Sequence, residues 1–383
     1  MQLSRLILEN FRNHSSLELE LNEDAPTYIV GPNALGKTNI LEAIYLLALT
    51  KSFRTSRQQD MIEWGKDFCR VKGFFSKTGG ASKAGSSTGA KSGKTTPLEL
   101  ELFFGVPPQP LKSLKLNGVK TSAVKFIGNC QIVFFHPEDL NMLYLGPDLR
   151  RRYLDILNIQ VGPRYYAALR SYKRVMEQRN ALLKRIKEGL GQAQDLAVWD
   201  DQLMEHGEQL IGQRTETIAF LNERISAIYD EMSGKADVIS ISYEASAPAG
   251  EFGEKLKNSL HKDLQAEFTT TGPHRDDLTF SLNGRPIGAH ASRGEYRSLL
   301  LALKLLELEF YKEKSGEKPL LLLDDVFSEL DLNRQKMLLK AIEGHQTIIT
   351  TTHLDQTPER KHRSLKLESK EIEVFPGDSA VHG

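Results

Sequence analysis

The chain of 383 residues is 40% hydrophobic and 26% charged. This composition is too apolar for intrinsic disorder, and the length suffices for two packed lobes or two domains. Lys and Arg together number 50, as do Asp and Glu. Because the charges balance, the composition gives no electrostatic reason to expect a nucleic-acid partner, and any such affinity must come from local clusters of cations.

The two cysteines, Cys69 and Cys130, are far apart and lack metal-ligand spacing. This pattern argues against a disulfide framework or a zinc site and fits a reducing cytosol, so we expect both thiols to be inert. Arg5 and Glu9 interrupt what would have to be an apolar signal region, and no stretch of about eighteen uncharged apolar residues occurs. We therefore expect a cytoplasmic protein without a membrane partner.

In chain order, the hydrophobic pattern predicts strands first and a helix directly after a glycine-rich turn. The strands are expected at 3–11, 15–22 and 26–31, and the helix at 38–49. Residues 76–96 are almost wholly Gly, Ser, Ala, Thr and Lys, which predicts a mobile insertion. Its Gly-Lys-Thr at 93–95 lacks a preceding strand and the glycine spacing of a phosphate-binding loop, so we interpret it as a chance match.

Two more strands are expected at 98–105 and 132–137, and helical periodicity dominates from 149 to 234. The apolar stripe of this helical region is expected to pack within its own lobe, although a partner helix is an alternative. A strand at 277–284, a helix at 294–314, a strand at 320–323 and another at 346–353 follow. The uninterrupted leucines at 320–323 are typical of a strand buried on both faces in a parallel sheet.

The segment Gly31 to Thr38, GPNALGKT, has the phosphate-binding-loop pattern of Gly, four residues, Gly, Lys and Thr. Its members, Gly31, Pro32, Asn33, Ala34, Leu35, Gly36, Lys37 and Thr38, and the following Asn39, are the predicted nucleotide-binding residues. Glycines let the backbone wrap closely around phosphate oxygens at the start of a helix. Lys37 would contact the β and γ phosphates of ATP, and the Thr38 hydroxyl would bind Mg²⁺.

The run LLLLDDVF at 320–327 ends a buried strand in two acids, Asp324 and Asp325. Such a strand could end in acids for solubility alone, so its significance depends on the phosphate-binding loop. With that loop present, Asp324 is the expected metal-side acid and Asp325 the expected general base.

Upstream of the acidic strand, Ser292 and Glu295 form a predicted capping box, and Gly294 permits close approach at the helix start. By itself this pattern indicates only a well-capped helix. Its place before the acidic strand resembles the signature motif of ATP-binding cassettes, in which the helix start contacts the γ-phosphate held by a second subunit. Residues 328–331 resemble the D-loop, His353 the switch histidine, and Gln131 is the candidate glutamine-loop residue.

Several segments in this order resemble the RecF family between residues 7 and 355. They are LENFRNH, GPNALGKTNILEAIYLL, SFRT, FHPEDL, RRRYLDI, TGPHRDDL, ASRGEYRSLLLALKL, LLLDDVFSELD and TTTHLD. The resemblance implies an α/β ATP-binding-cassette head with a compact helical second lobe. Structural-maintenance-of-chromosomes proteins differ, because they need hundreds of coiled-coil residues between the two halves of the ATP site. The predicted division is lobe I at 1–135 and 318–383, and lobe II, carrying the signature motif, at 136–317.

The resemblance further implies a protein that binds ATP and Mg²⁺ and dimerises head to head around two nucleotides. It would bind DNA at gaps and single-strand to duplex junctions and assist recombinase loading with RecO and RecR. Recombinational repair, replication restart and the SOS response are the implied processes.

The chain departs from the family at Ala34 and Leu35, where Gly and Gln are common, and at Arg293 and Tyr296, which replace glutamines of the signature helix. Asp325 stands where many cassette ATPases have Glu, so its carboxylate should lie further from an attacking water. We therefore expect slow hydrolysis, stimulated by DNA, with ATP acting mainly as a dimerisation switch.

Three basic clusters are candidates for contact with DNA phosphates, although each could equally be a solvated face. They are Lys51 with Arg54 and Arg57; 150–152; and Lys173 with Arg174 and Arg179. Arg12 is a further candidate for approaching the nucleotide. Three alternatives are left open. The first is a P-loop kinase or transferase that acts on a small molecule, and the second is the cassette subunit of a transporter. The third is the ATPase head of an overcoming-lysogenization-defect-type nuclease, although too few residues follow His353 for a nuclease domain.

Overall fold

A computed structural model describes residues 1–21, 26–77, 96–106, 111–234, 236–352, 363–368 and 371–376. The chain divides into two compact units, the first formed by 1–139 with 307–383 and the second by 140–306. The sequence-based division ended lobe II at residue 317, whereas the structural boundary falls inside a long helix, after Leu306. Among the described residues, no helix is both long enough and apolar enough to cross a bilayer.

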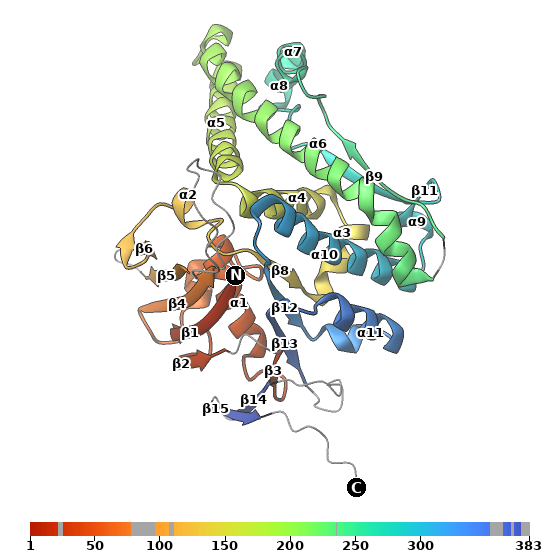
Figure 1. Cartoon of the computed structure of the whole chain (residues 1–383). Coiled ribbons are helices and arrows are strands. Elements are labelled where there is room, and N and C mark those ends of the chain that lie inside the picture. The colour runs from red at the N-terminus through yellow and green to blue at the C-terminus, as the bar shows by residue number, and fades with distance from the viewer. Residues whose placement is uncertain are drawn as a thin grey trace, which may run out of the picture. The chain divides into compact units, whose positions relative to one another are not determined.

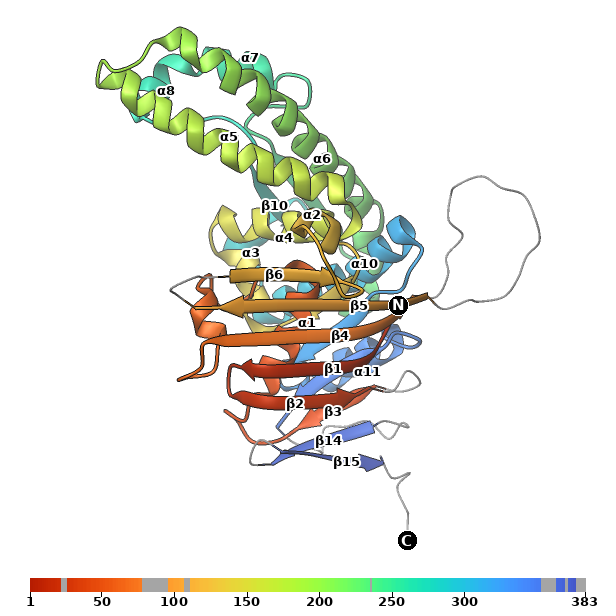
Figure 2. The ribbon, with the colours of Figure 1, turned by 90° about the vertical axis from the view of Figure 1, so that its left-hand side faces the viewer.

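The first unit holds two six-stranded sheets (Figures 1 and 2). The antiparallel sheet has the order β2-β1-β4-β5-β6-β7, with β1 Gln2–Phe11, β2 His14–Glu20, β4 Phe68–Lys77, β5 Thr96–Gly105, β6 Leu111–Leu116 and β7 Val119–Lys120. The second sheet has the order β15-β14-β3-β13-β12-β8, with β3 Thr27–Val30, β8 Ile132–Phe135, β12 Leu320–Asp324, β13 Thr347–Thr351, β14 Arg363–Glu368 and β15 Glu371–Pro376.

Neighbouring strands of the second sheet are parallel except β14 and β15, which pair antiparallel. The strands β3, β8, β12 and β13 are buried at every position. The apolar runs of β8 and β12 are typical of strands covered on both faces. The expectation for 320–323 is therefore confirmed.

Helix α1 (Lys37–Leu49) contacts strands of both sheets, among them β1, β4, β12 and β13. It is therefore covered on opposite sides, which explains why its residues from Ile40 to Leu49 are buried all round rather than on one stripe. The remaining helices of this unit are α2 (Ala123–Phe126) and α11 (Leu332–Ala341), and α10 (Arg293–Ser315) contains the unit boundary.

The second unit is mostly helical. Its helices are α3 Asn141–Tyr144, α4 Pro147–Val161, α5 Pro163–Lys187, α6 Ala197–Ser233, α7 Phe252–Asn258, α8 Leu260–Ala266 and α9 Ile287–His290. A small sheet, β9 (Ile239–Glu244), β10 (Asp277–Leu282) and β11 (Arg285–Pro286), has the order β11-β10-β9.

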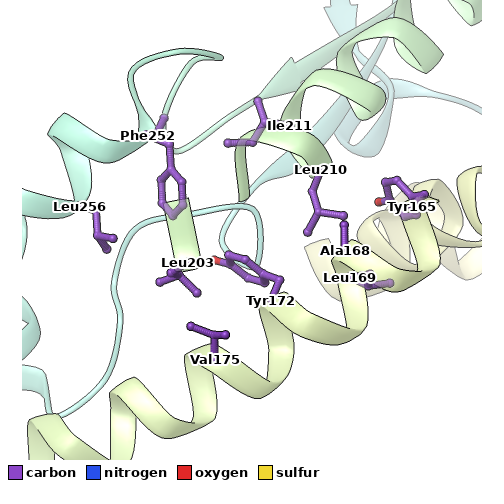
Figure 3. Close-up of a cluster of buried hydrophobic side chains, with 11 residues drawn as sticks. Tyr165, Ala168, Leu169, Tyr172, Val175, Leu203, Leu210, Ile211, Phe252 and Leu256 are labelled. Carbon is purple, nitrogen blue, oxygen red and sulfur yellow. The ribbon is translucent and has the colours of Figure 1, made fainter. Parts of the chain in front are cut away.

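The apolar stripe of the helical region packs inside this unit (Figure 3). Tyr165, Tyr172 and Val175 of α5 meet Leu203 and Leu210 of α6, and residues of α7 complete the cluster. The prediction that this stripe packs within its own lobe is therefore confirmed.

The predicted insertion at 76–96 is strand at both ends, since Ser76 pairs with Pro97 and Lys77 with Thr96. Residues 78–95 lie outside the described part of the chain. Cys69 and Cys130 are buried thiols, and burial raises the pKa of each to about 12, which agrees with their expected inertness.

Candidate functional site

The loop from Gly31 to Gly36 connects the carboxyl end of β3 to the start of α1. Pro32, Asn33 and Ala34 are exposed, whereas Gly31 and Lys37 are buried. The loop is thus anchored at both ends while its middle faces solvent. The first backbone N–H groups of a helix lack an intrahelical acceptor, so the start of α1 suits the binding of phosphate.

Two loop residues have left-handed backbone. Gly36 has φ 98° and Ala34 has φ 68°. At Gly36 a side chain would also collide with Asn13 and with His14 Nε2, so only glycine fits there. Ala34 adopts a conformation that costs an L-residue energy, at a position where the RecF family commonly has glycine.

Lys37 folds back over this loop. Its Nζ donates to the carbonyl oxygen of Gly31 at 2.6 Å and to that of Pro32 at 2.9 Å. Burial lowers the pKa of Lys37 below its ordinary value, while the charges of Asp325 and Asp324 act in the opposite direction. A neighbouring pair of acids thus favours the ammonium form that a phosphate ligand needs.

The acidic strand ends beside the phosphate-binding loop. Asp324 Oδ1 accepts hydrogen bonds from Thr38 Oγ1 at 2.9 Å and from Thr350 Oγ1 at 2.6 Å. Thr350 lies on β13, between β3 and β12, so the order of parallel strands brings these three residues to one edge. His136, just beyond β8, places Nε2 3.4 Å from Asp324 Oδ2.

Asp325 follows Asp324 with φ 51°, and its N–H donates to the carbonyl oxygen of Thr350 at 3.2 Å and to Thr350 Oγ1 at 3.1 Å. Its Oδ2 accepts from Ser328 Oγ at 3.2 Å. The left-handed turn separates the two carboxylates, so that Asp324 is 6% exposed and binds hydroxyls while Asp325 contacts the start of the predicted D-loop.

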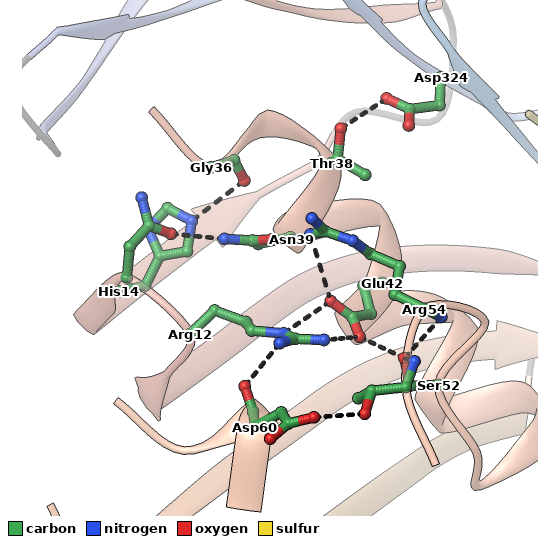
Figure 4. Close-up of polar contacts among 12 residues, drawn as sticks. Arg12, His14, Gly36, Thr38, Asn39, Glu42, Ser52, Arg54, Asp60 and Asp324 are labelled. Atoms are coloured by element: carbon green, nitrogen blue, oxygen red, sulfur yellow. Dashed lines mark hydrogen bonds and ion pairs between the residues drawn. The ribbon is translucent and has the colours of Figure 1, made fainter. Parts of the chain in front are cut away.

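Behind the loop, the β1–β2 turn supports its backbone (Figure 4). Asn13 Nδ2 donates to the carbonyl oxygen of Leu35 at 2.9 Å, and Asn39 Nδ2 donates to Asn13 Oδ1 at 2.7 Å. His14 Nε2 lies 3.2 Å from the carbonyl oxygen of Gly36. Sequence reasoning missed Asn13 and His14 as supports of the loop.

Arg12 contacts the protein below the loop. Its Nε and NH2 donate to the buried Glu42 at 2.9 and 2.6 Å, and its NH1 donates to the carbonyl oxygen of Asp60 at 2.5 Å. All three guanidinium nitrogens thus donate to protein acceptors, and Arg12 braces α1; its approach to a nucleotide stays a prediction. A signal was available, because Glu42 is the one acid of α1 and lies among the apolar residues that follow Asn39.

The assignment of Gln131 to the glutamine loop is wrong. Gln131 precedes β8, and its carbonyl oxygen accepts from the N–H of Leu320, the first residue of β12. Asp324 is the last residue of β12, so Gln131 lies at the opposite edge of the parallel sheet, about 13 Å away at 3.3 Å per residue. His136 occupies the edge where Gln131 was expected.

The predicted capping box at α10 is confirmed: the Ser292 N–H donates to Glu295 Oε2 at 2.7 Å, and the Glu295 N–H donates to Ser292 Oγ at 3.3 Å. Ser292 is exposed and Gly294 half-buried, both in the second unit. His353 lies outside the described residues.

The basic clusters differ in how much charge they leave for a ligand. Arg179 is fully buried and ion-paired with Asp200 and Asp263, and Arg150 is ion-paired with Asp277. Both are therefore removed as phosphate contacts, because their cations are neutralised. Arg54 donates to Asn39 Oδ1 at 2.7 Å and remains 47% exposed beside the loop.

The side chains at this edge fit a Mg²⁺–nucleotide complex. Thr38 and Asp324 supply adjacent hard oxygen donors, Lys37 supplies a cation, and the loop leads into the N-terminus of α1. Mg²⁺ bound there would neutralise phosphate charge.

Comparison with known proteins gives the family. A family model described as the RecF/RecN/SMC N terminal domain matches residues 2–374. The DNA replication and repair protein RecF of Lachnoclostridium phytofermentans is 37% identical over 358 residues, covering 93% of this chain and 94% of that protein. The chain belongs to the RecF family. RecF of Moorella thermoacetica is also 37% identical, over 362 residues, covering 94% of this chain and 92% of that protein.

Solved RecF structures share the fold over nearly the whole chain. The structure of the recombination mediator protein RecF-ATP in the RecFOR pathway has a TM-score of 0.85, with 34% identity and 97% coverage of both chains. That of RecF-ATPrS has a TM-score of 0.86, with 32% identity and 98% coverage of both chains. The Smc head domain of Pyrococcus furiosus, at 14% identity and a TM-score of 0.51 over 97% of this chain and 95% of that one, shares the fold. The chain therefore has the ATP-binding-cassette head fold, as the resemblance implied.

Proposed function

We propose that this protein is an ATP-gated DNA-binding protein of recombinational repair and replication restart. The observation that carries the proposal is the meeting of Lys37, Thr38 and Asp324 at one edge of a parallel sheet, in a chain of the RecF family. RecF relatives have been solved with ATP as recombination mediators, which supports ATP as the nucleotide of this chain.

In the proposed complex, the backbone from Gly31 to Thr38 surrounds the phosphates, and Lys37 exchanges its two carbonyl partners for phosphate oxygens. Thr38 and Asp324 exchange their mutual hydrogen bond for Mg²⁺. Asp325 accepts a proton from the attacking water and acts slowly because its side chain is short.

A second copy of the chain would supply Ser292 and Gly294 to the γ-phosphate, so that two nucleotides are held between two subunits. The exposed Ser292 and the N-terminus of α10, which is 23 residues long, support this role. His353 would face the same phosphate. The dimer would bind DNA at gaps and single-strand to duplex junctions, act with RecO and RecR to load recombinase, and support the SOS response.

The test is the molar mass by light scattering with ATP, with ADP, and for Lys37→Ala with ATP, each with and without gapped duplex DNA. We expect a dimer that forms with ATP only, is lost in Lys37→Ala and retains DNA. A monomer indifferent to nucleotide, with no DNA retained, would instead favour a small-molecule P-loop enzyme.

A further inference from the structure

Charge is segregated between the two longest helices of the second unit. Helix α5 carries eight Lys and Arg residues and one acid, Glu177. Helix α6, which packs against it, carries eight Asp and Glu residues and two arginines. The chain as a whole has no net charge, so α5 is a local concentration of positive charge that the composition conceals.

Five of these cations lie on one face of α5. At 3.6 residues per turn, Arg170, Lys173, Arg174, Lys184 and Arg185 fall within an arc of about 120°, with Glu177 and Ala181 between them. The five cations are exposed, whereas the buried residues of α5, among them Tyr165, Tyr172 and Val175, lie on the opposite face in the apolar core. We call the five residues the basic stripe. Its orientation away from the core is therefore fixed by packing.

The basic stripe is electrostatically unsatisfied. Within the described parts of the chain, none of its five cations has an ion pair, and Arg185 donates only to the carbonyl oxygen of Leu190, at 3.3 Å. Lys184 acts on Glu267 only at longer range, since Lys187 holds that carboxylate at 2.7 Å.

Arg179 provides the contrast on the same helix. It faces the core and binds Asp200 at 2.6 Å, Asp263 at 2.7 Å and Thr269 at 2.9 Å. Where α5 uses a cation for structure, the protein thus supplies acids to neutralise it. The basic stripe has no such partners, although leaving like charges side by side on a helix is destabilising.

We propose that the basic stripe binds the phosphate backbone of nucleic acid. The inference rests on the proposed DNA-binding function and names the element that performs it. The stripe runs from Arg170 to Arg185, 15 rises of about 1.5 Å or about 22 Å, which matches about six base pairs of duplex. Flexible cations with one intervening acid and no exposed aromatic side chain suit sequence-independent contact with phosphates rather than recognition of bases.

The experiment compares two double variants that remove the same charge from exposed helical sites of the second unit. Lys173→Ala with Arg174→Ala alters the basic stripe, whereas Lys255→Ala with Lys257→Ala alters α7, where the lysines are exposed beside Glu251 and Glu254. Binding of a fluorescent mixed-sequence duplex is measured with ATP by anisotropy between roughly 50 and 250 mM salt, a range over which phosphate contacts weaken strongly.

We expect the α5 variant to bind the duplex about tenfold more weakly at the lowest salt. The slope of log K against log salt should also become shallower by about 1–2, because two phosphate contacts are removed. The α7 variant should match the wild type in both quantities. Lys173→Gln with Arg174→Gln, which keeps side-chain length, should behave as the alanine variant, and the light-scattering mass with ATP should be unchanged.

An unchanged slope in the α5 variants while the wild type binds DNA would overturn this inference and leave the proposed function standing. Equal losses in the α5 and α7 variants would also overturn it, because total charge would then explain the result. A wild type that binds no duplex with ATP at any salt would overturn the proposed function and the inference together. In that case the stripe would suit an acidic protein partner.

Discussion

At the scale of single residues, Ala34 is a strained position in the phosphate-binding loop. Its φ of 68° costs a residue with a Cβ about 1–2 kcal/mol, whereas glycine adopts it freely at an entropic cost of about 0.5–1 kcal/mol. We expect Ala34→Gly to raise the free energy of unfolding by up to about 1 kcal/mol, measured as a higher thermal midpoint.

The matched control is Ala43→Gly, in the buried interior of α1. Glycine at position 43 costs about 1 kcal/mol of helix propensity and relieves no backbone strain, so the thermal midpoint of Ala43→Gly should fall. If the thermal midpoint of Ala34→Gly falls as well, the left-handed backbone of Ala34 is not strained in solution.

At the scale of elements, His274 ties the segment before β10 to α5. Its Nε2 lies 2.9 Å from the carbonyl oxygen of Thr269, which can only accept, so Nε2 carries the proton. Nδ1 is then the acceptor for the Tyr172 hydroxyl, at 2.7 Å. Both contacts use the neutral ring, and burial lowers the pKa of His274 to about 4.

This arrangement predicts the pH dependence of stability. Between pH 6.5 and about 4, His274 is protonated in the unfolded chain, where its pKa is about 6.5, but stays neutral in the folded chain. The stabilisation is therefore complete above about pH 6.5 and is lost as the pH falls through this window, by at most about 3 kcal/mol. Thermal midpoints at pH 7.5 and 5 should differ less for His274→Gln than for the wild type, and an equal difference would refute the assignment.

At the scale of the whole molecule, the proposed switch depends on slow loss of ATP. Asp325→Asn keeps the shape of the side chain but removes its basicity, so turnover should fall by at least about tenfold, within the range of general-base effects. Nucleotide affinity should be retained because Lys37, Thr38 and Asp324 are untouched. Light scattering over time should then show that the ATP-induced dimer of Asp325→Asn lasts longer than the dimer of the wild type. If the variant hydrolyses ATP as fast as the wild type, Asp325 is not the general base.

Much of the fold was accessible from the sequence because the periodicity of apolar residues is local. The strand at 26–31, the helix after it and the buried strand at 320–323 correspond to β3, α1 and β12. The strands β4, β6, β7, β9, β11, β14 and β15 were not predicted. Their pairing partners, not a strong local pattern, make them strands, as in the register of β4 between β1 and β5.

Local sequence by itself determined the glycine loop, the capping box at Ser292 and the order of motifs along the chain, because each depends on residues within one turn or one helix start. Only the tertiary structure decided which side chains meet. Strand order put Thr350 and His136 beside Asp324 and moved Gln131 to the far edge of the sheet, and burial with two acids removed Arg179 from the ligand-binding cations. A cation that is buried in ion pairs is lost to a ligand, and the acid that neutralises it can lie far away in the sequence, as Asp263 does for Arg179.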